Sequence, residues 1–278
     1  MSTPVLLLGL PETGKSTFLA ALSWALGSGD FRLRRTLLAR PRDYISGLEN
    51  AWLEGRRIDR TLKGSSHRIE LGFADGENEA RLVLPDISGE SLLSFWGDRR
   101  WTRQYDQDAQ GAGGLLLFVR ADQLHCPSLV EDFADATAEE EDDPTDEGAQ
   151  GPEAPLEPFD ASKVCPQTVL VDLLQSVARQ RRYRPLPTTV VISAWDTQPV
   201  DREPSDWLKA EAPLLSQFLK WNGGRFPSRV FGVSAQGGDY DRDREALLRH
   251  ADPKDRLVVA SDESTGRDIT LVLAELTA

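Results

Sequence analysis

The first residues with recognisable chemistry are "GLPETGKST" at positions 9–17, which have the spacing G-x-x-x-x-G-K-[ST]. In such a loop, backbone N–H groups converge on the start of a helix and form a nest for anions. Lys15 would add a positive charge between the β- and γ-phosphates of a nucleotide, and the Ser16 hydroxyl would bind Mg²⁺. The pattern therefore predicts a nucleotide-phosphate site. Its residues are Glu12, Thr13, Gly14, Lys15, Ser16 and Thr17.

A second motif, "LVLPDISGE" at 82–90, carries groups that can respond to the γ-phosphate. Asp86 ends an apolar strand and would reach Mg²⁺ through a water, while the N–H of Gly89 would meet the γ-phosphate. Glu90 follows, and its carboxylate could accept a hydrogen bond from the attacking water and act as its base. A second interpretation is that Glu90 only occupies the first turn of a helix, where negative charge is favourable.

Between these motifs lies "RRIDRTLKG" at 56–64, which contains a candidate metal ligand. Thr61 could give its hydroxyl to Mg²⁺ and its N–H to the γ-phosphate. Arg60, followed by Arg57 and Arg56, is the nearest candidate for a built-in catalytic arginine. The alternative is a solvated basic loop with an incidental threonine.

The segment "VVISAWDTQ" at 190–198 follows an apolar run, at the place where a base-reading motif [NT]-K-x-D is expected. Two oxygens of Asp196 can accept from guanine N1–H and N2–H₂, a pair that adenine does not present. Ser193 and Ala194 depart from the motif, and the lysine they lack normally covers the base and braces the loop. Trp195 either stacks on the base or is a core residue.

The next segment, "VFGVSAQG" at 230–237, predicts a strand followed by Ser234 and Ala235, whose backbone could contact guanine O6. The order of the motifs along the chain favours a guanine nucleotide, GTP or GDP. An ATPase stays an alternative, because the base-reading motif is degenerate.

The motifs require a frame that brings distant segments together. Continuous apolar runs predict buried strands, and the stretches between them have helical periodicity. Strands that alternate with helices predict a mostly parallel, three-layer α/β sheet with helices on both faces. The strands are expected in 4–10, 65–73, 80–86, 114–120, 188–196 and 229–235, with one more edge strand at 256–262. The helices are expected after the phosphate loop and in 42–55, 88–111, 167–180, 205–221 and from about 268.

The motifs extend from residue 9 to residue 235, so we expect one domain, 1–278, with two insertions. The first, 28–60, is a helical insertion that leads to Thr61. The second, 129–164, is rich in Pro, Gly and acidic residues, and such a composition predicts a disordered loop.

Charge and cysteine content exclude several classes of protein. The chain has 32 Lys and Arg against 45 Asp and Glu, a net charge of −13, which argues against nucleic acid as a partner. Residues 131–160 alone hold thirteen acidic residues and no basic one, so the excess is local. Cys126 and Cys165 lack metal-ligand spacing, and no apolar stretch is long enough to span a membrane. These features predict a cytoplasmic protein.

With these residues in view, the chain resembles a Ras-type G domain of the translation-factor-related class of P-loop GTPases. In detail it is similar to the bacterial double-GTPase group, which is found beside effector modules in predicted conflict and defence systems. The resemblance rests on "LLLGLPETGKSTFLAAL", "AWLEGRRIDRT", "LVLPDISGE", "LLLFV" and "VVISAWD", and covers most of the chain outside 129–164. It implies that GTP and Mg²⁺ bind and that Thr61 is the threonine of the first switch.

The resemblance also raises a question about Glu12. In the tRNA-modification and ribosome-assembly GTPases, an Asn at this place helps to hold a potassium ion. A carboxylate here either holds a monovalent cation more strongly or repels the phosphates, and the sequence leaves both open.

Two functional classes follow. One is a hydrolysing switch, slow without a protein partner, which would be an effector, a second GTPase or a nucleotide-dependent dimer. The other is a nucleotide-held scaffold with little hydrolysis.

Overall fold

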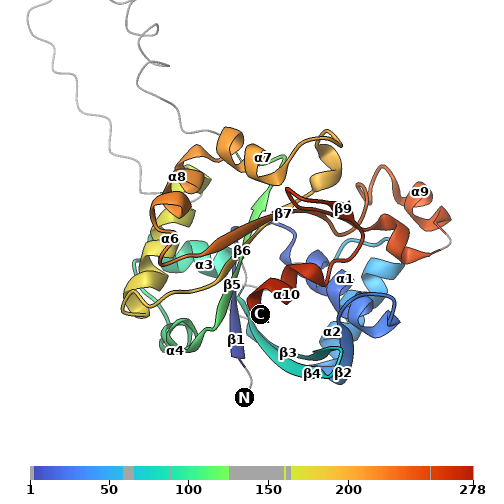
Figure 1. The fold of residues 1–278 in the computed structure, drawn as a ribbon, viewed down its shortest axis with the longest axis horizontal. Coiled ribbons are helices and arrows are strands. Elements are labelled where there is room, and N and C mark those ends of the chain that lie inside the picture. The colour runs from blue at the N-terminus through green and yellow to red at the C-terminus, as the bar shows by residue number, and fades with distance from the viewer. Residues whose placement is uncertain are drawn as a thin grey trace, which may run out of the picture.

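The computed structural model describes residues 3–58, 66–87, 89–124, 160, 164–250 and 252–277. Arg60, Thr61 and most of the predicted insertion 129–164 lie outside these residues. Within the described part, strands form one sheet in the order β2-β3-β4-β1-β5-β6-β7-β8-β9 (Figure 1). Their bounds are β1 Thr3–Leu8, β2 Arg34–Arg40, β3 Ser66–Asp75, β4 Asn78–Ile87, β5 Gly114–Arg120, β6 Thr188–Ser193, β7 Ser228–Ser234, β8 Val258–Ala260 and β9 Thr265–Gly266.

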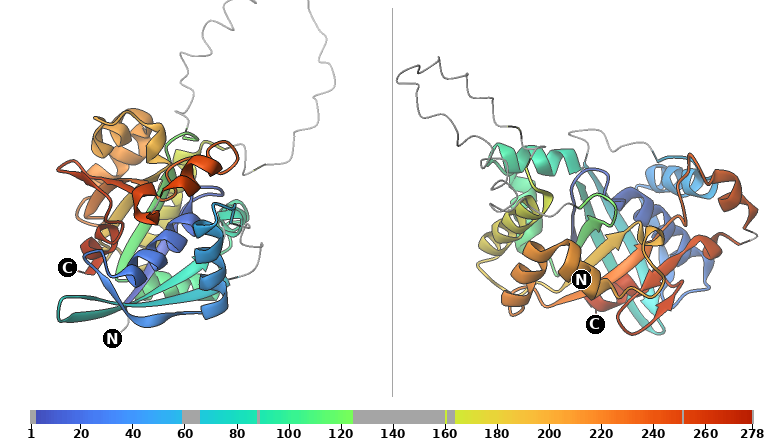
Figure 2. Two further views of the ribbon diagram at one scale, coloured as in Figure 1. Left: turned by 90° about the vertical axis from the view of Figure 1, so that its right-hand side faces the viewer. Right: turned by 90° about the horizontal axis from the view of Figure 1, so that it is seen from above.

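Helices cover both faces of this sheet, which confirms the predicted three-layer α/β architecture (Figure 2). One face carries α1 Lys15–Ser28, α2 Arg42–Leu53, α9 Arg244–Arg249 and α10 Leu271–Thr277. The other carries α3 Gly89–Gly97, α4 Arg103–Gly111, α6 Pro166–Gln180, α7 Pro204–Glu211 and α8 Pro213–Trp221. Short 3₁₀ turns occupy Trp195–Thr197 and Pro253–Arg256. Among the described helices, none has the length and apolar character that crossing a membrane requires.

The apolar run of β1 forms a central strand because both of its faces meet helices. Val5 and Leu7 pack into the hydrophobic cluster under α1 and α10, whereas Leu6 and Leu8 pack into the cluster under α4 and α6. All four side chains are almost fully buried. Burial of such a side chain stabilises the fold by about 1.5–3 kcal/mol, so β1 is fixed from both sides.

The topology determines where a ligand can bind. β1 pairs in parallel with β4 on one side and with β5 on the other, and β5, β6 and β7 continue in parallel. The chain therefore crosses from one side of β1 to the other after β4. Ligands in open α/β sheets bind outside the carboxyl ends of the strands at such a switch point. The loop 9–14 leaves the carboxyl end of β1 at this position.

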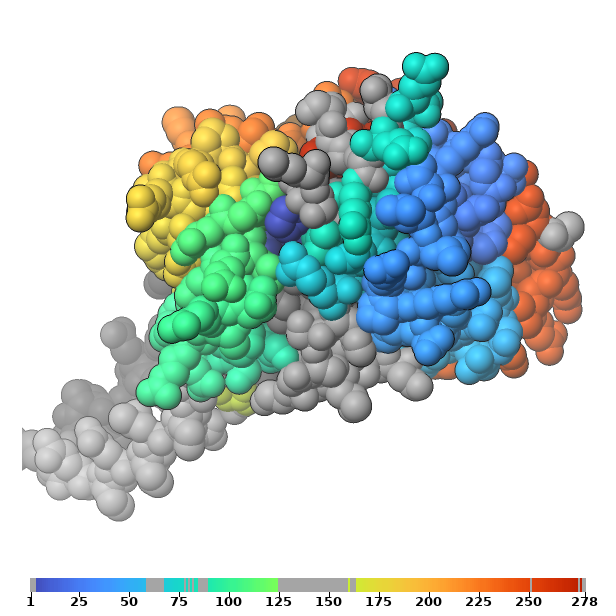
Figure 3. Space-filling model, turned by 90° about the horizontal axis from the view of Figure 1, so that it is seen from below, coloured from blue at the N-terminus to red at the C-terminus, as the bar shows by residue number. Residues whose placement is uncertain are grey.

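The structure differs from the expected elements in several places. The segment 28–60 contains β2 as well as the expected helix, and β2 pairs antiparallel with β3 at the edge of the sheet. In Figure 3 the blue residues of β2 and α2 lie beside the cyan residues of β3 and β4. The helix expected over 88–111 is two helices, since Thr102 caps a new one by accepting from Tyr105 N–H at 3.1 Å.

The helix expected over 205–221 is also divided, because Pro213 begins α8 directly after Ala212. The last helix begins at Leu271 rather than near Asp268. The Asp268 carboxylate instead accepts hydrogen bonds from the N–H and hydroxyl of Thr270, at 2.9 and 2.5 Å.

Candidate functional site

The loop after β1 has the backbone of an anion nest. Gly14 precedes the first residue of α1 and adopts a left-handed conformation, with φ of 79°. A side chain is strained at such a φ, so glycine is needed here. Glu12, two residues earlier, also has a positive φ, 62°, and its side chain is exposed. The loop thereby turns sharply enough to bring its N–H groups to the start of the helix dipole.

Lys15 is folded back onto this loop. Its ammonium group is buried and donates to the carbonyl oxygens of Gly9 and Leu10, both at 2.9 Å, and to Thr13 Oγ1 at 3.3 Å. These contacts hold the positive charge beside the N–H groups that would receive phosphate. Ser16 and Thr17 are half-buried in the first turn of α1, where the sequence placed them.

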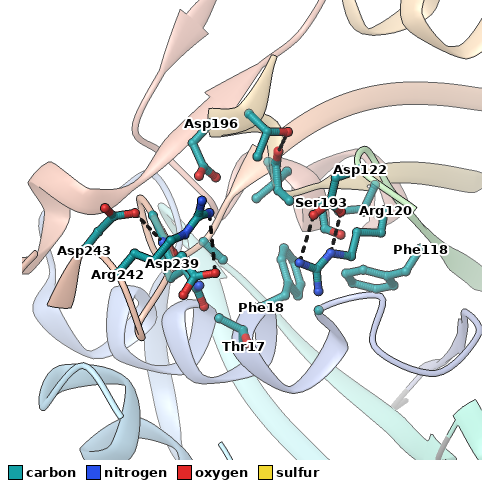
Figure 4. A pocket seen from close by; sticks show the side chains of 18 residues that line it. Thr17, Phe18, Phe118, Arg120, Asp122, Ser193, Asp196, Asp239, Arg242 and Asp243 are labelled. Carbon is teal, nitrogen blue, oxygen red and sulfur yellow. Dashed lines mark hydrogen bonds and ion pairs between the residues drawn. The ribbon is translucent and has the colours of Figure 1, made fainter. Parts of the chain in front are cut away.

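A cavity of about 310 Å³ extends from the start of α1 along the carboxyl ends of β5, β6 and β7 (Figure 4). Gly14 and Thr17 line the end next to the phosphate loop, and Asp196 and Ala235 line the end next to the predicted base-reading segments. The structure thus brings together residues that lie more than two hundred positions apart in the chain. The cavity joins the predicted phosphate and base sites.

Asp196 is the exposed acidic group that follows β6. It lies in a 3₁₀ turn preceded by Ala194, which is left-handed with φ of 55°. Ser193 is buried and its hydroxyl donates to the Val119 carbonyl at 3.2 Å, so it joins β6 to β5. Asp196 lies beyond the end of β6, and its exposed side chain borders the cavity.

Trp195 is a core residue, which corrects its interpretation as a base-stacking side chain. It is 4% exposed, belongs to the cluster on the α6 side of the sheet and does not line the cavity. Its ring lies over the backbone of Gly232 in β7, where an added Cβ would lie 2.2 Å from Trp195 Cδ2. Close approach of the ring and the strand requires glycine at that position.

Ser234 is the last residue of β7, and Ala235 follows it. Ser234 is buried, and its hydroxyl accepts a hydrogen bond from the N–H of Gly237 at 3.0 Å, which shapes the loop. Ala235 lines the cavity, and its carbonyl accepts from Trp52 Nε1–H of α2 at 2.7 Å. The Arg256 guanidinium lies 4.2 Å from the centroid of the Trp52 ring. α2 is thereby attached to the base end of the cavity.

Three acidic and two basic side chains that the motifs did not predict also line the cavity: Asp122, Asp239, Asp243, Arg120 and Arg242. Arg120, at the end of β5, makes hydrogen bonds to both oxygens of Asp122, at 2.6 and 3.1 Å. Figure 4 shows this pair on the opposite side of the cavity from Arg242 and Asp239. Arg242 pairs with Asp239 at 3.6 Å. The sequence indicates a role for Arg120 in the site only through its place as a basic residue at the end of a buried strand.

Hydrogen bonds organise the loop that contains Asp239. Its carboxylate accepts from the N–H of Asp241 at 2.8 Å, and the carboxylate of Asp243 accepts from the N–H of Asp239 at 2.9 Å. The pKa of Asp239 is lowered from its ordinary value, first by the hydrogen bond from Asp241. Both carboxylates border the cavity.

The second motif lies beside the phosphate loop, at the carboxyl end of β4. The backbone places Asp86 there, one strand away from β1, and Gly89 is the first residue of α3. Glu90 is half-buried in the first turn of α3, a position that suits both of its interpretations. Among the described His, Cys, Asp and Glu side chains, none form a group of three that could hold a metal ion.

The two described arginines of the segment 56–64 make ion pairs. Arg57 pairs with Asp241, in the loop that borders the cavity, and Arg56 Nε lies 2.5 Å from Glu54. All four side chains are more than half exposed. Their guanidinium groups are accordingly open to exchange with solvent or another ligand.

Comparison with known proteins adds an independent finding. A family model described as Double-GTPase 1 matches residues 6–276. Among solved structures, the chain is similar to Roco2 RocCORdC of Methanosarcina barkeri bound to GDP, with 13% identity and a TM-score of 0.35. This likeness covers 88% of this chain and 47% of that one, so the chain spans about half the length of the Roco protein. None of the curated proteins matches.

Proposed function

The chain belongs to the Double-GTPase 1 family, and from this premise we propose that it is a molecular switch that binds GTP and hydrolyses it slowly. The observation that carries the proposal is the single cavity that joins Gly14 of the phosphate loop to Asp196 and Ala235. Phosphates at one end and a purine at the other would fit this arrangement. At the base end, the Asp196 carboxylate can accept hydrogen bonds and the backbone at Ala235 can contact guanine O6, and this combination favours guanine over adenine.

Binding would begin at the phosphate loop. The N–H groups of 12–16 and the ammonium of Lys15 would receive the phosphates in place of the loop carbonyls that Lys15 contacts now. At the other end, the Asp196 carboxylate would accept from guanine N1–H and N2–H₂. An adenine would leave this carboxylate without its donors, which disfavours ATP by an amount that can reach several kcal/mol.

The residues present suit Mg²⁺, which is bound by few protein groups together with phosphate oxygens and water. Ser16, at the start of α1, would supply a hydroxyl beside Lys15. Asp86, at the carboxyl end of β4, and Thr61 are the other proposed ligands. When bound, the metal would neutralise charge on the β- and γ-phosphates.

For hydrolysis we propose that Glu90 orients the attacking water and that Thr61 and Arg60 complete the site. Glu90 is in the first turn of α3, adjacent to Gly89, whose N–H would contact the γ-phosphate. The negative charge of Glu90 would face the γ-phosphate, so slow turnover is expected until a protein partner or a second copy orders the site. We propose a bacterial signalling or conflict system as its setting.

The test compares nucleotides first and hydrolysis second. Competition of labelled GDP by unlabelled GDP and ADP should show at least tenfold weaker displacement by ADP, and Asp196→Ala should remove most of that difference. Asp201→Ala, an exposed aspartate outside the cavity, is the matched control. Equal displacement by both nucleotides in the wild type would favour an ATPase.

Single-turnover hydrolysis of GTP should then be measured for the wild type and Glu90→Ala at equal nucleotide occupancy, in potassium and in sodium. A slower rate in Glu90→Ala supports the catalytic role. Equal rates would make Glu90 a helix-start residue, and no hydrolysis by either protein would favour the scaffold.

A further inference from the structure

Arg120 is held in a fixed position on one wall of the cavity. Its Nε and one terminal nitrogen donate to the two oxygens of Asp122, and its other terminal nitrogen donates to the Glu12 carbonyl at 3.2 Å. The Glu12 carbonyl belongs to the phosphate loop. One guanidinium thus contacts the loop that would bind phosphate and borders the space that leads to Asp196.

The same wall is attached to the base-reading turn. The N–H of Ala121 donates to the Ser193 carbonyl at 3.0 Å, and Ser193 Oγ donates to the Val119 carbonyl. The end of β5 and the turn that begins at Ser193 therefore form one hydrogen-bonded unit. Arg120 connects this unit to the phosphate loop.

The charge and shape of this group suit a planar ligand. Asp122 neutralises the guanidinium, so Arg120 contributes little net charge for phosphate. Its side chain is still 32% exposed, and it faces a cavity in which the neighbouring motif residues, Ser193 and Ala194, are small. A guanidinium plane stacks well on aromatic rings.

We propose that Arg120 lies against the face of the purine and fixes it relative to the phosphate loop, with Asp122 as the residue that orients the guanidinium. Arg120 is thus a binding residue for the base. The small side chain of Ala194 leaves room for the ring beside it. This inference rests on the proposed nucleotide binding and adds the contact that positions the base.

Titration calorimetry with GDP tests the proposal on the full chain. Arg120→Ala should weaken GDP binding at least tenfold, and Arg120→Lys should weaken it three- to tenfold, because a lysine keeps the charge but has no plane to stack. Asp122→Ala should also weaken it threefold or more. The control Arg249→Ala removes an exposed arginine of α9 that pairs with Glu245 at 3.5 Å outside the cavity, and should bind GDP as the wild type does.

A ligand without a base distinguishes two effects of Arg120: stacking of its guanidinium on the purine, and support of the phosphate loop through the Glu12 carbonyl. Inorganic pyrophosphate, measured by its displacement of labelled GDP, should bind Arg120→Ala within threefold of the wild type. Equal losses for GDP and pyrophosphate would overturn the proposal, and so would GDP binding within twofold of the wild type in Arg120→Lys or Arg120→Ala. Failure of the wild type to bind GDP would instead refute the proposed function.

Discussion

The ammonium group of Lys15 contacts oxygen atoms of its own loop, at the place where the phosphates of GDP would bind. It would then donate to a phosphate oxygen. Lys15→Ala should weaken GDP binding by about 10- to 100-fold, since a hydrogen bond to a charged group contributes about 1.5–3 kcal/mol. Titration calorimetry with GDP measures the loss. Lys209→Ala is the control, because Lys209 is an exposed helix lysine that pairs with Asp206 at 2.7 Å.

Circular dichroism of Lys15→Ala should match that of the wild type, because the Lys15 ammonium donates to the carbonyls of Gly9 and Leu10, which lie in the loop outside the helices and strands. Unchanged GDP affinity in this variant would refute the phosphate-loop assignment.

Individual site residues differ in how far the sequence could predict them. The places of Gly14, Thr17 and Asp196 beside the cavity follow from motif spacing, because a short local pattern determines where each lies. Arg120 could not be predicted, since its contact with the Glu12 carbonyl joins segments 108 positions apart. The burial of Trp195 depends likewise on Gly232 in the neighbouring strand.

At the scale of elements, β7 and the base-reading turn fit together only while Gly232 lacks a side chain. Gly232→Ala would place a Cβ inside the Trp195 ring, so it should lower the free energy of unfolding by about 1–3 kcal/mol. Urea denaturation measures this. The control Gly224→Ala adds a Cβ in open space after α8 and should change stability much less. Equal effects of the two substitutions would contradict the packing described here.

An ion pair fixes α3 to α6. Asp172 of α6 accepts from Trp96 Nε1–H at 2.8 Å and pairs with Arg99. Burial opposes ionisation of Asp172, but the hydrogen bonds from Arg99 and Trp96 outweigh it and lower its pKa below the ordinary 3.8. The carboxylate therefore stabilises the fold above the ordinary pKa, and this stabilisation is lost as the pH falls through the lowered one.

Asp172→Asn should accordingly reduce the free energy of unfolding by about 1 kcal/mol at pH 7 and by less near pH 3. Urea denaturation at both pH values tests this. Asp98→Asn, at an exposed position just after α3, is the control and should show no such dependence on pH. A loss that is the same at both pH values would show that charge is not its source.

The central strands were predictable from the sequence, and the additional strand expected at 256–262 is present as β8, but the outermost strands β2 and β9 were not predicted. β5 and β6 are buried almost throughout because helices cover both of their faces. β2 has no such pattern, since Leu37 and Leu38 are 56% and 61% exposed and only Ala39 is buried. Its pairing with β3 comes from tertiary structure, which a local pattern does not contain.

At the scale of the molecule, the acidic segment 129–164 separates β5 from α6. Leu124, before the segment, and Val164, its last residue, both pack against the hydrophobic cluster on the α6 side of the sheet. Replacement of 129–163 by a Gly-Ser linker of about 15 residues should therefore leave GDP affinity within about twofold. Calorimetry with GDP and thermal denaturation measure the effect, and a loss of affinity beyond tenfold would assign the segment a role in binding.

The hydrogen bond from Trp52 to the Ala235 carbonyl joins two parts of the molecule with different tasks. α2 leads towards the proposed first switch, and Ala235 borders the base end of the cavity. Any partner that shifts α2 would also shift Ala235, and nucleotide binding would in turn alter the affinity for that partner. Thermodynamic linkage requires the two effects to be equal in free energy. The tryptophan thereby gives a partner bound to α2 a way to act as a nucleotide-exchange regulator without entering the cavity.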